Sequence, residues 1–328
     1  MKALEKNELA ALIQGALRVE ERPDGSLCPH RFTEKQEKYY AENTDFGVKL
    51  TAGTNIRLEF LTDSDFFVFS YAVTQASSRR FFYFDIYVDG VFTQRVGREQ
   101  VEAFAGTIFE KMGAGTHRVT IYFPPLFTVL VRELSLAGGA TVRPVPKKRR
   151  IYILGDSITQ GYDARFSSQT YANLLTDALD AQGVNQGVGG EVYRPEMLDA
   201  DLPYRPDLIS VAYGSNDWGH WSSADEMREK ATAFYRDLRK IYPRIPIISI
   251  LPVWRADCMH TTAVGSFEDA RRIVREAAEA AGAFIVDGMK LTPHEPAAYS
   301  DAFLHPNDLG FKFYAQGLLV ALRPLLSE

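Results

Sequence analysis

Residues 151–159 read IYILGDSIT, four apolar residues followed at once by Gly155, Asp156 and Ser157. A short apolar run that ends at a turn residue is typical of a buried strand in a parallel sheet. Beyond it the pattern alternates between strands and helices. We expect further strands at 207–213, 246–251 and 283–286, and helices at 168–182, 193–201, 224–242, 266–281 and 308–322. Such alternation predicts an α/β domain built on a parallel sheet.

The residues before this domain have a different sequence pattern. Short segments rich in Phe, Tyr and Val run from about 45 to 140, and we expect strands at 54–61, 66–73, 81–88, 91–94, 107–110, 118–123 and 128–136. Asp89-Gly90 predicts a hairpin between the third and fourth of these strands. Many short strands separated by turn residues predict an all-β sandwich of jelly-roll type. The first 20 residues predict a short amphipathic helix ahead of it.

These two sequence patterns divide the chain into two domains. We expect a β-sandwich domain with a short leading helix at 1–142, a linker at 143–150 and the α/β domain at 151–328. The linker reads RPVPKKRR. Its prolines and clustered bases favour a stiff, solvated connection over an anion-binding site.

Composition limits the possible functions. The 328 residues include 37 Lys and Arg against 42 Asp and Glu, a net charge of −5, which argues against a nucleic-acid partner. Cys28 and Cys258 are far apart in sequence, so neither a disulfide scaffold nor a zinc site is expected. Charged residues interrupt the N-terminus before any apolar run forms, and no long apolar window occurs. We therefore expect a soluble, cytoplasmic protein without a signal peptide, a membrane span or a membrane partner. The oligomeric state stays open.

Polar fragments follow the predicted strands of the α/β domain. Ligands of an open parallel sheet bind beyond the carboxyl ends of its strands. Two fragments directly follow predicted strands: GDSIT at 155–159 and GSND at 214–217. A third, NQGVGG at 185–190, precedes the helix expected at 193–201, and a fourth, DAFLHP at 301–306, lies after the last strand and just ahead of the last helix. Each alone is an ordinary turn or cap. Together they supply a serine, a histidine, a carboxylate and several N–H donors.

Those groups suit acyl transfer. A serine hydroxyl such as that of Ser157 is a good nucleophile only when a base takes its proton. Among the six histidines, His305 lies beside a proline at a predicted strand–helix junction and fits that base. Asp301 is the nearest upstream acid and would orient its ring. The N–H groups of Ser157 and Gly190 and the amide of Asn216 would stabilise the oxyanion.

In this order, the four fragments resemble the GDSL or SGNH hydrolase family over about 148–325. The resemblance assigns Ser157 as the nucleophile, Gly190 and Asn216 to the oxyanion hole, and His305 to the last block. It implies a flavodoxin-like α/β/α fold and ester hydrolysis with neither a metal nor a cofactor. The order of a sandwich followed by an SGNH domain is similar to that of some two-domain bacterial carbohydrate acetylesterases.

One departure concerns the acid. The family usually places Asp three residues before His, whereas Asp301 stands four before His305. Either the extra residue loops out and the pair stays intact, or a backbone carbonyl or no group orients the histidine, as in the Ser–His dyads of some relatives. Asp287 is a rival acid, but its place at a strand end favours a structural role.

Four further residues are candidates for the substrate pocket: Asp156, Glu191, Trp218 and Trp254. Both tryptophans fall on predicted carboxyl-end loops, where an aromatic platform would suit a sugar ring or an acyl group. Tryptophan is about as often a packing residue. For Asp156, a structural acid that bonds loop N–H groups is favoured over a metal ligand.

The sequence thus favours a serine esterase that removes short acyl groups, above all acetyl, from a carbohydrate-like substrate. That substrate would be a small-molecule or oligosaccharide ester. A lysophospholipase or thioesterase is the alternative within the enzyme class and would need a long apolar groove. A non-catalytic glycan-binding protein is the alternative outside it, and the intact catalytic fragments argue against it. The Phe- and Tyr-rich strands are explained as a sandwich core, with a carbohydrate-binding face as the alternative.

Overall fold

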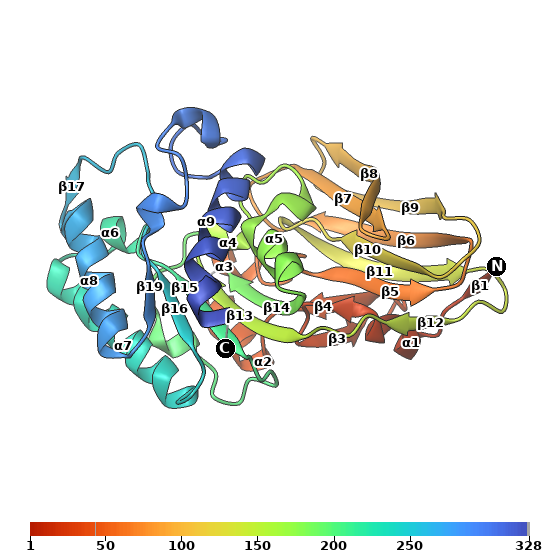
Figure 1. The fold of residues 1–328 in the computed structure, drawn as a ribbon, viewed down its shortest axis with the longest axis horizontal. Helices are drawn as coiled ribbons and strands as arrows, with labels where there is room; N and C mark the ends of the chain where they lie inside the picture. The colour runs from red at the N-terminus through yellow and green to blue at the C-terminus, as the bar shows by residue number, and fades with distance from the viewer. Residues whose placement is uncertain (43, 327–328) are drawn as a thin grey trace.

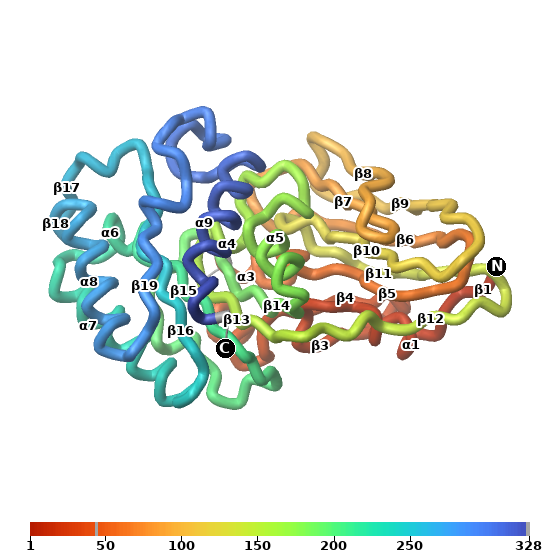
Figure 2. The backbone as a smooth tube through the Cα atoms, in the orientation of Figure 1, coloured from red at the N-terminus to blue at the C-terminus, as the bar shows by residue number. Residues whose placement is uncertain are grey.

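The computed structural model describes residues 1–42 and 44–326. Figure 1 shows an elongated molecule with a β-sandwich at one end and α/β layers at the other, and Figure 2 traces the backbone between them. Both expected folds are therefore present, in the expected order.

Two antiparallel sheets form the sandwich. In one, the strand order is β3-β4-β11-β6-β9 with β1 beside β11; in the other, it is β12-β5-β10-β7-β8 with β2 beside β5. The first sheet comprises β1 (Lys2–Ala3), β3 (Arg18–Glu21), β4 (Leu27–His30), β6 (Phe66–Gln75), β9 (Ala103–Lys111) and β11 (Phe127–Leu136). The second comprises β2 (Ile13–Gln14), β5 (Arg57–Thr62), β7 (Phe81–Val88), β8 (Val91–Glu99), β10 (His117–Tyr122) and β12 (Val142–Pro144).

The aromatic residues of this half form its core. Alternate residues of β6 are buried, among them Phe67, Phe69 and Tyr71, because successive side chains of a strand point to opposite faces. Phe84 of β7 packs on Tyr71 with ring centroids 4.5 Å apart. The short helix expected within the first 20 residues is α1 (Lys6–Ala11), after which the chain pairs with the sheets as β2 and β3.

The α/β half is built on a parallel sheet of strand order β14-β13-β15-β16-β19. Its strands are β13 (Arg149–Gly155), β14 (Ala181–Gly187), β15 (Leu208–Ala212), β16 (Ile247–Ile250) and β19 (Phe284–Val286). One face packs against α5 (Tyr171–Ala178) and α9 (Asp308–Leu326), the other against α7 (Ala224–Ile241) and α8 (Phe267–Ala280). The sheet order is the flavodoxin-like order that the family resemblance implies.

One predicted helix is too long and another is wrong. The one at 168–182 ends at Ala178, because Asp180 has a φ of 47° and the following residues pair with β13 as β14. The one at 193–201 is only a 3₁₀ turn, η2 (Pro195–Met197). Asp199 turns the chain there, since its carboxylate accepts the N–H of Asp201.

Residues 143–150 are less solvated than expected. β12 pairs with β5, and β13 already begins at Arg149. Between them, the Nζ of Lys147 lies 2.7 Å from Oε1 of the buried Glu59, and the Lys147 side chain is 5% exposed. A buried carboxylate therefore draws one base of the run into the protein.

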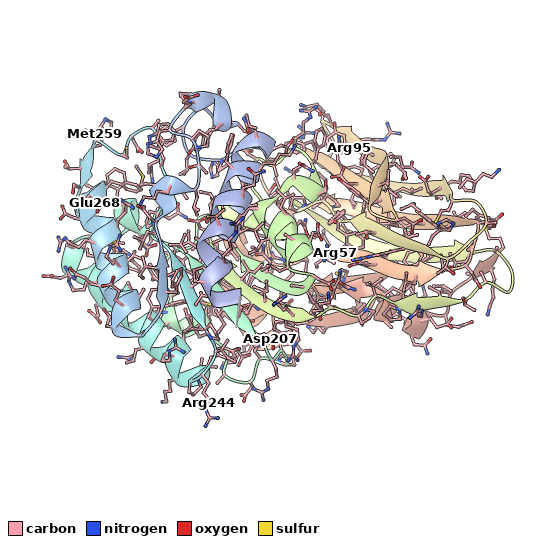
Figure 3. All side chains as sticks on the ribbon, viewed as in Figure 1. Arg57, Arg95, Asp207, Arg244, Met259 and Glu268 are labelled. Carbon is pink, nitrogen blue, oxygen red and sulfur yellow. The ribbon has the colours of Figure 1, made fainter. Side chains whose placement is uncertain are left out.

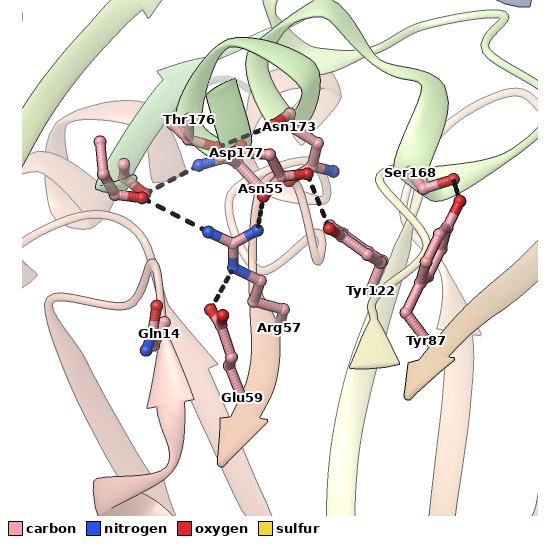
Figure 4. Close-up of polar contacts among 12 residues, drawn as sticks. Gln14, Asn55, Arg57, Glu59, Tyr87, Tyr122, Ser168, Asn173, Thr176 and Asp177 are labelled. Carbon is pink, nitrogen blue, oxygen red and sulfur yellow. Dashed lines mark hydrogen bonds and ion pairs between the residues drawn. The ribbon is translucent and has the colours of Figure 1, made fainter. Parts of the chain in front are cut away.

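Polar contacts join the two halves (Figure 4). Arg57 of β5 pairs with Asp177 of α5 and lies 3.1 Å from Glu59, and the Tyr122 hydroxyl donates to Asp177 at 2.7 Å. The Asn55 amide donates to the carbonyl of Gly183 in β14 at 2.9 Å. Figure 3 places Arg57 where the sandwich meets the α/β layers.

A second connection comes from residues 31–42 and 44–50, which we call the bridging segment. It contains α2 (Glu34–Ala41) and α3 (Thr44–Gly47). Although it belongs to the first half in sequence, Phe32, Tyr40 and Leu50 are buried in the same hydrophobic cluster as Val184 and Val188. This segment brings part of the first half to the carboxyl end of β14.

Candidate active site

Ser157 lies at the carboxyl end of β13, between β14 and β15 in the parallel sheet. The strand ends at Gly155, where a side chain would collide with Thr159 and with the carbonyl of Ala212. Asp156 then caps the short helix α4 (Ser157–Gln160), accepting the N–H of Ile158 at 3.0 Å. This turn places Ser157 at the first position of α4, just beyond the carboxyl end of β13.

His305 faces Ser157. Its Nε2 lies 3.0 Å from the Ser157 Oγ, and its Nδ1 lies 2.7 Å from Oδ2 of Asp301. The hydroxyl, the imidazole and the carboxylate therefore form one continuous chain of contacts. A proton leaving Ser157 can pass to Nε2 while Asp301 holds the Nδ1–H.

The loop from Asp301 to His305 absorbs the extra residue noted in the sequence. Ala302 adopts a left-handed φ of 56°. The Asp301 Oδ1 accepts the backbone N–H groups of Phe303, Leu304 and His305 at 2.9, 2.8 and 3.1 Å. Burial alone would raise the pKa of Asp301, but these N–H groups and the His305 ring outweigh it and lower the pKa. The acid facing His305 is therefore ionised at neutral pH.

Gly190 and Asn216, the two residues expected to donate to an oxyanion, lie on neighbouring loops that line the pocket of Ser157. Gly190 follows β14 with a φ of 89°, a conformation that favours glycine. The Asn216 amide precedes α6 (Asp217–His220) and donates to the carbonyl of Glu191 at 3.0 Å. One N–H of that amide is thus tied to the Gly190 loop, and an amide carries two.

The buried Asp217 holds the loops that carry Gly190 and Asn216. Its buried carboxylate accepts the N–H of Tyr193, the N–H of Gly214 and the indole N–H of Trp221, each at 2.9 Å. Burial outweighs these bonds and raises the pKa of Asp217 to about 6. Asp217 therefore joins the Asn216 loop to the loop after Gly190, a role that sequence reasoning missed.

Ser157, Gly190, Asn216 and His305 line one pocket of about 470 Å³. Both halves of the chain build it. The other lining residues are Gln160, Tyr162, Gly189 and Leu304 from the α/β half and Asp45, Val48, Lys49, Ser77 and Ser78 from the first half. A larger pocket of about 790 Å³ between β19 and α9 shares none of these residues.

Comparison with known proteins agrees with this geometry. The profile of the GDSL-like Lipase/Acylhydrolase family matches residues 153–313. Residues 153–313 belong to that family. The protein is accordingly a carboxylic ester hydrolase. Among curated proteins, no match was found.

Solved structures resemble the hydrolase over both halves. A salicylyl-acyltransferase from a tetracycline biosynthetic pathway, SsfX3, is 22% identical with a TM-score of 0.83, covering 99% of this chain and 97% of that one. A family two carbohydrate esterase from Cellvibrio japonicus is 20% identical with a TM-score of 0.67, covering 98% and 97%. An acetyl xylan esterase from Butyrivibrio proteoclasticus is 16% identical with a TM-score of 0.60, covering 84% and 90%. At these identities the likeness shows a shared two-part fold.

A second carboxylate of the hydrolase lies near the histidine. Asp163 has its Oδ2 3.9 Å from the His305 Nδ1, and its side chain is 4% exposed. Arg79, on the loop between β6 and β7, donates to both Asp163 oxygens, at 2.5 and 2.9 Å. Arg79 therefore balances the charge of Asp163, whereas Asp301 makes the short contact with the ring.

The carboxylates of Asp163 and Asp301 and a ring nitrogen of His305 lie within 4.8 Å of one another, close enough to hold a metal ion. Each already has a partner: Asp163 pairs with Arg79, and Asp301 with His305 and the backbone of its own loop. The contacts of all three groups are accounted for within the protein.

None of the four tentative pocket residues lines the pocket around Ser157. Asp156 is 4% exposed and caps α4, and burial raises its pKa to about 7. Glu191 is buried and accepts from Arg194 at 2.7 Å. Trp218 is 1% exposed, because it packs on Phe267 and its indole donates to the carbonyl of Gly265.

Trp254 lies half-buried between His294 and Tyr299, with ring centroids 6.0 and 4.9 Å away. The rival acid Asp287 pairs with Arg271 and accepts the N–H of Met289, which is a structural role.

Within residues 1–42 and 44–326, every helix is too short or too polar to cross a bilayer.

Proposed function

We propose that this hydrolase is a serine esterase that removes short acyl groups, chiefly acetyl, from a carbohydrate-like alcohol. The observation that carries the proposal is the line from Ser157 through His305 to Asp301, at 3.0 and 2.7 Å, opening into a pocket that also contains Gly190 and Asn216. Nucleophile, base and oxyanion donors converge on one space, as acyl transfer requires.

In the proposed mechanism, the Ser157 Oγ attacks the ester carbonyl carbon and its proton passes to the His305 Nε2. The carbonyl π electrons move to oxygen, where Gly190 N–H, Ser157 N–H and the Asn216 amide donate to the new charge. The tetrahedral adduct collapses, the C–O bond to the alcohol breaks, and the imidazolium protonates that alcohol. Water then attacks the acyl-enzyme with the same base, and the acid leaves.

The pocket lining supports a short acyl group and a polar alcohol. Its apolar groups are the Val48 and Leu304 side chains and the ring of Tyr162, too few to form the long apolar groove that a lysophospholipase needs. Ser77 and Ser78 offer hydroxyl groups suited to a polyol. The fold shared with a family two carbohydrate esterase and an acetyl xylan esterase favours the same substrate class.

A chain-length series tests the proposal. Nitrophenyl esters from acetyl to decanoyl are compared with acetylated monosaccharides and xylooligosaccharides, using Ser157→Ala as the control. We expect kcat/KM to fall as the acyl chain lengthens, acetate to be released from the sugars, and the control to be inactive. A rise with chain length indicates a lysophospholipase or thioesterase instead. Tight glycan capture without turnover indicates a binding protein.

Acyl transfer alongside hydrolysis is a second candidate activity of the same site, favoured by the likeness over 99% of the chain to a salicylyl-acyltransferase. The same acyl-enzyme would form, and an alcohol would replace water as the second nucleophile. Adding a sugar acceptor to the nitrophenyl acetate assay separates the two outcomes. Acetate as the main product supports hydrolysis, and an acetylated sugar supports transfer.

A further inference from the structure

Lys49 of the bridging segment reaches into the catalytic pocket. Its Nζ donates to the carbonyl oxygen of Gly189 at 2.7 Å. This oxygen belongs to the same planar peptide group as the N–H of Gly190, the proposed oxyanion donor. A cation at the oxygen end of a peptide draws electron density toward it, which makes the N–H at the other end a stronger donor.

The other side of Gly189 is held as well. Its N–H donates to Oε1 of Gln160 at 2.8 Å, and Gln160 is buried in α4 beside Ser157. Gly190 follows with its left-handed φ. Gly189 is thus fixed at its N–H by α4 and at its carbonyl by Lys49, so the direction of the Gly190 N–H depends on both contacts.

Lys49 is itself anchored. The buried guanidinium of Arg31 donates to the carbonyl of Lys49 at 2.9 Å and to that of Gly187, at the end of β14, at 3.1 Å. The Lys49 Nζ lies 5.2 Å from the centre of the Phe46 ring. One arginine therefore ties the lysine backbone to the strand that carries the oxyanion loop.

Burial distinguishes this lysine from others on the same segment. Lys49 is half-buried, and desolvation lowers its pKa below the ordinary value. By contrast, Lys35 and Lys38 on α2 are exposed. Exposed charges contribute little because water screens them, whereas a desolvated charge polarises its neighbours more strongly.

We propose that Lys49 is a positioning residue of the oxyanion hole, which orients and polarises the Gly189–Gly190 peptide toward the charge that forms on the substrate oxygen. The proposal rests on the serine esterase mechanism proposed above. Since that charge develops only as the tetrahedral adduct forms, Lys49 acts on kcat much more than on KM.

Four variants test this: Lys49→Met, Lys49→Gln, Lys49→Arg and the matched control Lys38→Met. With nitrophenyl acetate, Lys49→Met should lower kcat about 10- to 100-fold, below the effect of deleting an oxyanion donor outright, and leave KM within about threefold. Lys49→Gln keeps a donor without the charge and should fall between Met and wild type. Lys49→Arg should recover most of the rate, and Lys38→Met should equal wild type. Thermal melts check that each variant is folded.

The inhibition constant of a reversible trifluoromethyl ketone provides a second test, because replacing a lysine with a purely structural role would leave that constant unchanged. It forms a tetrahedral adduct with a serine and places a negative oxygen in the oxyanion hole. Its inhibition constant should rise in Lys49→Met by the factor that kcat/KM loses, as expected for an analogue of the transition state. A Lys49→Met enzyme with wild-type kcat and inhibition constant, or one changed only in KM, would overturn the role of Lys49.

Failure of the underlying mechanism looks different. In that case Ser157→Ala keeps its activity and the ketone does not inhibit the wild-type enzyme. If Ser157→Ala is inactive, the ketone inhibits wild type and Lys49→Met matches wild type, the esterase mechanism stands and only the role of Lys49 is lost.

Discussion

The two halves of the molecule contribute different things to one pocket. The α/β half carries every group proposed to touch the reacting atoms, each on a loop at a strand end. The first half supplies contacts to those loops: Lys49 at the Gly189 carbonyl, Arg79 at Asp163, and Ser78 at the Tyr162 hydroxyl. The chemistry therefore belongs to one half, and part of its electrostatic surroundings to the other.

That difference explains why a motif locates one set of residues and not the other. Reacting groups must meet at fixed distances, which ties them to strand ends and gives them a recognisable spacing. A supporting cation needs only to lie near the right carbonyl or carboxylate, and any loop that packs there can supply it. Variants in the two halves should accordingly differ in the size of their effects.

The largest effect is expected from Ser157→Ala. Removing the nucleophile should lower kcat for acetyl-ester hydrolysis by at least about 10⁴-fold, because the oxyanion donors alone retain only residual catalysis. The melting temperature should change little. The Ser157 hydroxyl contacts His305 across the pocket, so its removal disturbs no packing in the protein core. Steady-state kinetics and a thermal melt check both parts. Activity within tenfold of wild type would contradict the assignment.

The two carboxylates near His305 provide the next contrast. Asp301→Asn should lower kcat about 10²- to 10⁴-fold, since an asparagine at 2.7 Å cannot stabilise the imidazolium. Asp163→Asn should lower it by less than about tenfold, because Asp163 lies 3.9 Å away and is paired with Arg79. Equal losses, or a larger loss for Asp163→Asn, would reverse the roles given to the two acids.

Arg79→Met should have a smaller and different effect. Without the guanidinium, the buried Asp163 carboxylate loses its cation, and an unpaired buried charge destabilises the fold. The melting temperature should therefore fall, while kcat for nitrophenyl acetate stays within about threefold of wild type. A thermal melt and steady-state kinetics check this, with Arg80→Met as the neighbouring control. A wild-type melting temperature would show that Arg79 does not stabilise Asp163.

The smallest effect on turnover is expected from Arg57→Met, at the junction but outside the pocket. It removes the arginine that joins Glu59 to Asp177, although Lys147 still pairs with Glu59. The loss of stability should therefore lie below the about 3–5 kcal/mol that an uncompensated buried charge costs. The melting temperature should fall clearly, and kcat below the melting range should stay close to wild type. Loss of turnover without loss of stability would mean that the junction acts on the site directly.

Much of the site was predictable from the sequence because strand ends converge. Four sequence fragments point to Ser157, Gly190, Asn216 and His305, and all four residues line one pocket. The sequence leaves the pairing of Asp301 with His305 open, since it depends on a left-handed turn at Ala302 that the sequence does not specify. Alanine is an unexpected residue for such a turn.

Other features could not be predicted because they depend on tertiary contacts. β14 reads AQGVNQG, with few strand-forming residues, and it is a strand because it pairs with β13 along its length. Helix α2 of the bridging segment reads EKQEKYYA, which is mostly polar, and polar side chains such as Gln36 help to hold it, since the Gln36 amide donates to Gln186 at 3.0 Å. Trp218 was placed on the right loop, but the sequence does not say which way a side chain points.

Covalent labelling tests the central claim, a serine nucleophile activated in this pocket, most directly. The enzyme is treated with a fluorophosphonate, and the labelled peptide is identified by mass spectrometry, with His305→Ala and Lys38→Met treated in parallel. The account predicts one adduct, on Ser157, that forms in step with the loss of activity, is slowed strongly by His305→Ala and is unaffected by Lys38→Met. An adduct on another residue, or full labelling of Ser157 with activity retained, would contradict it.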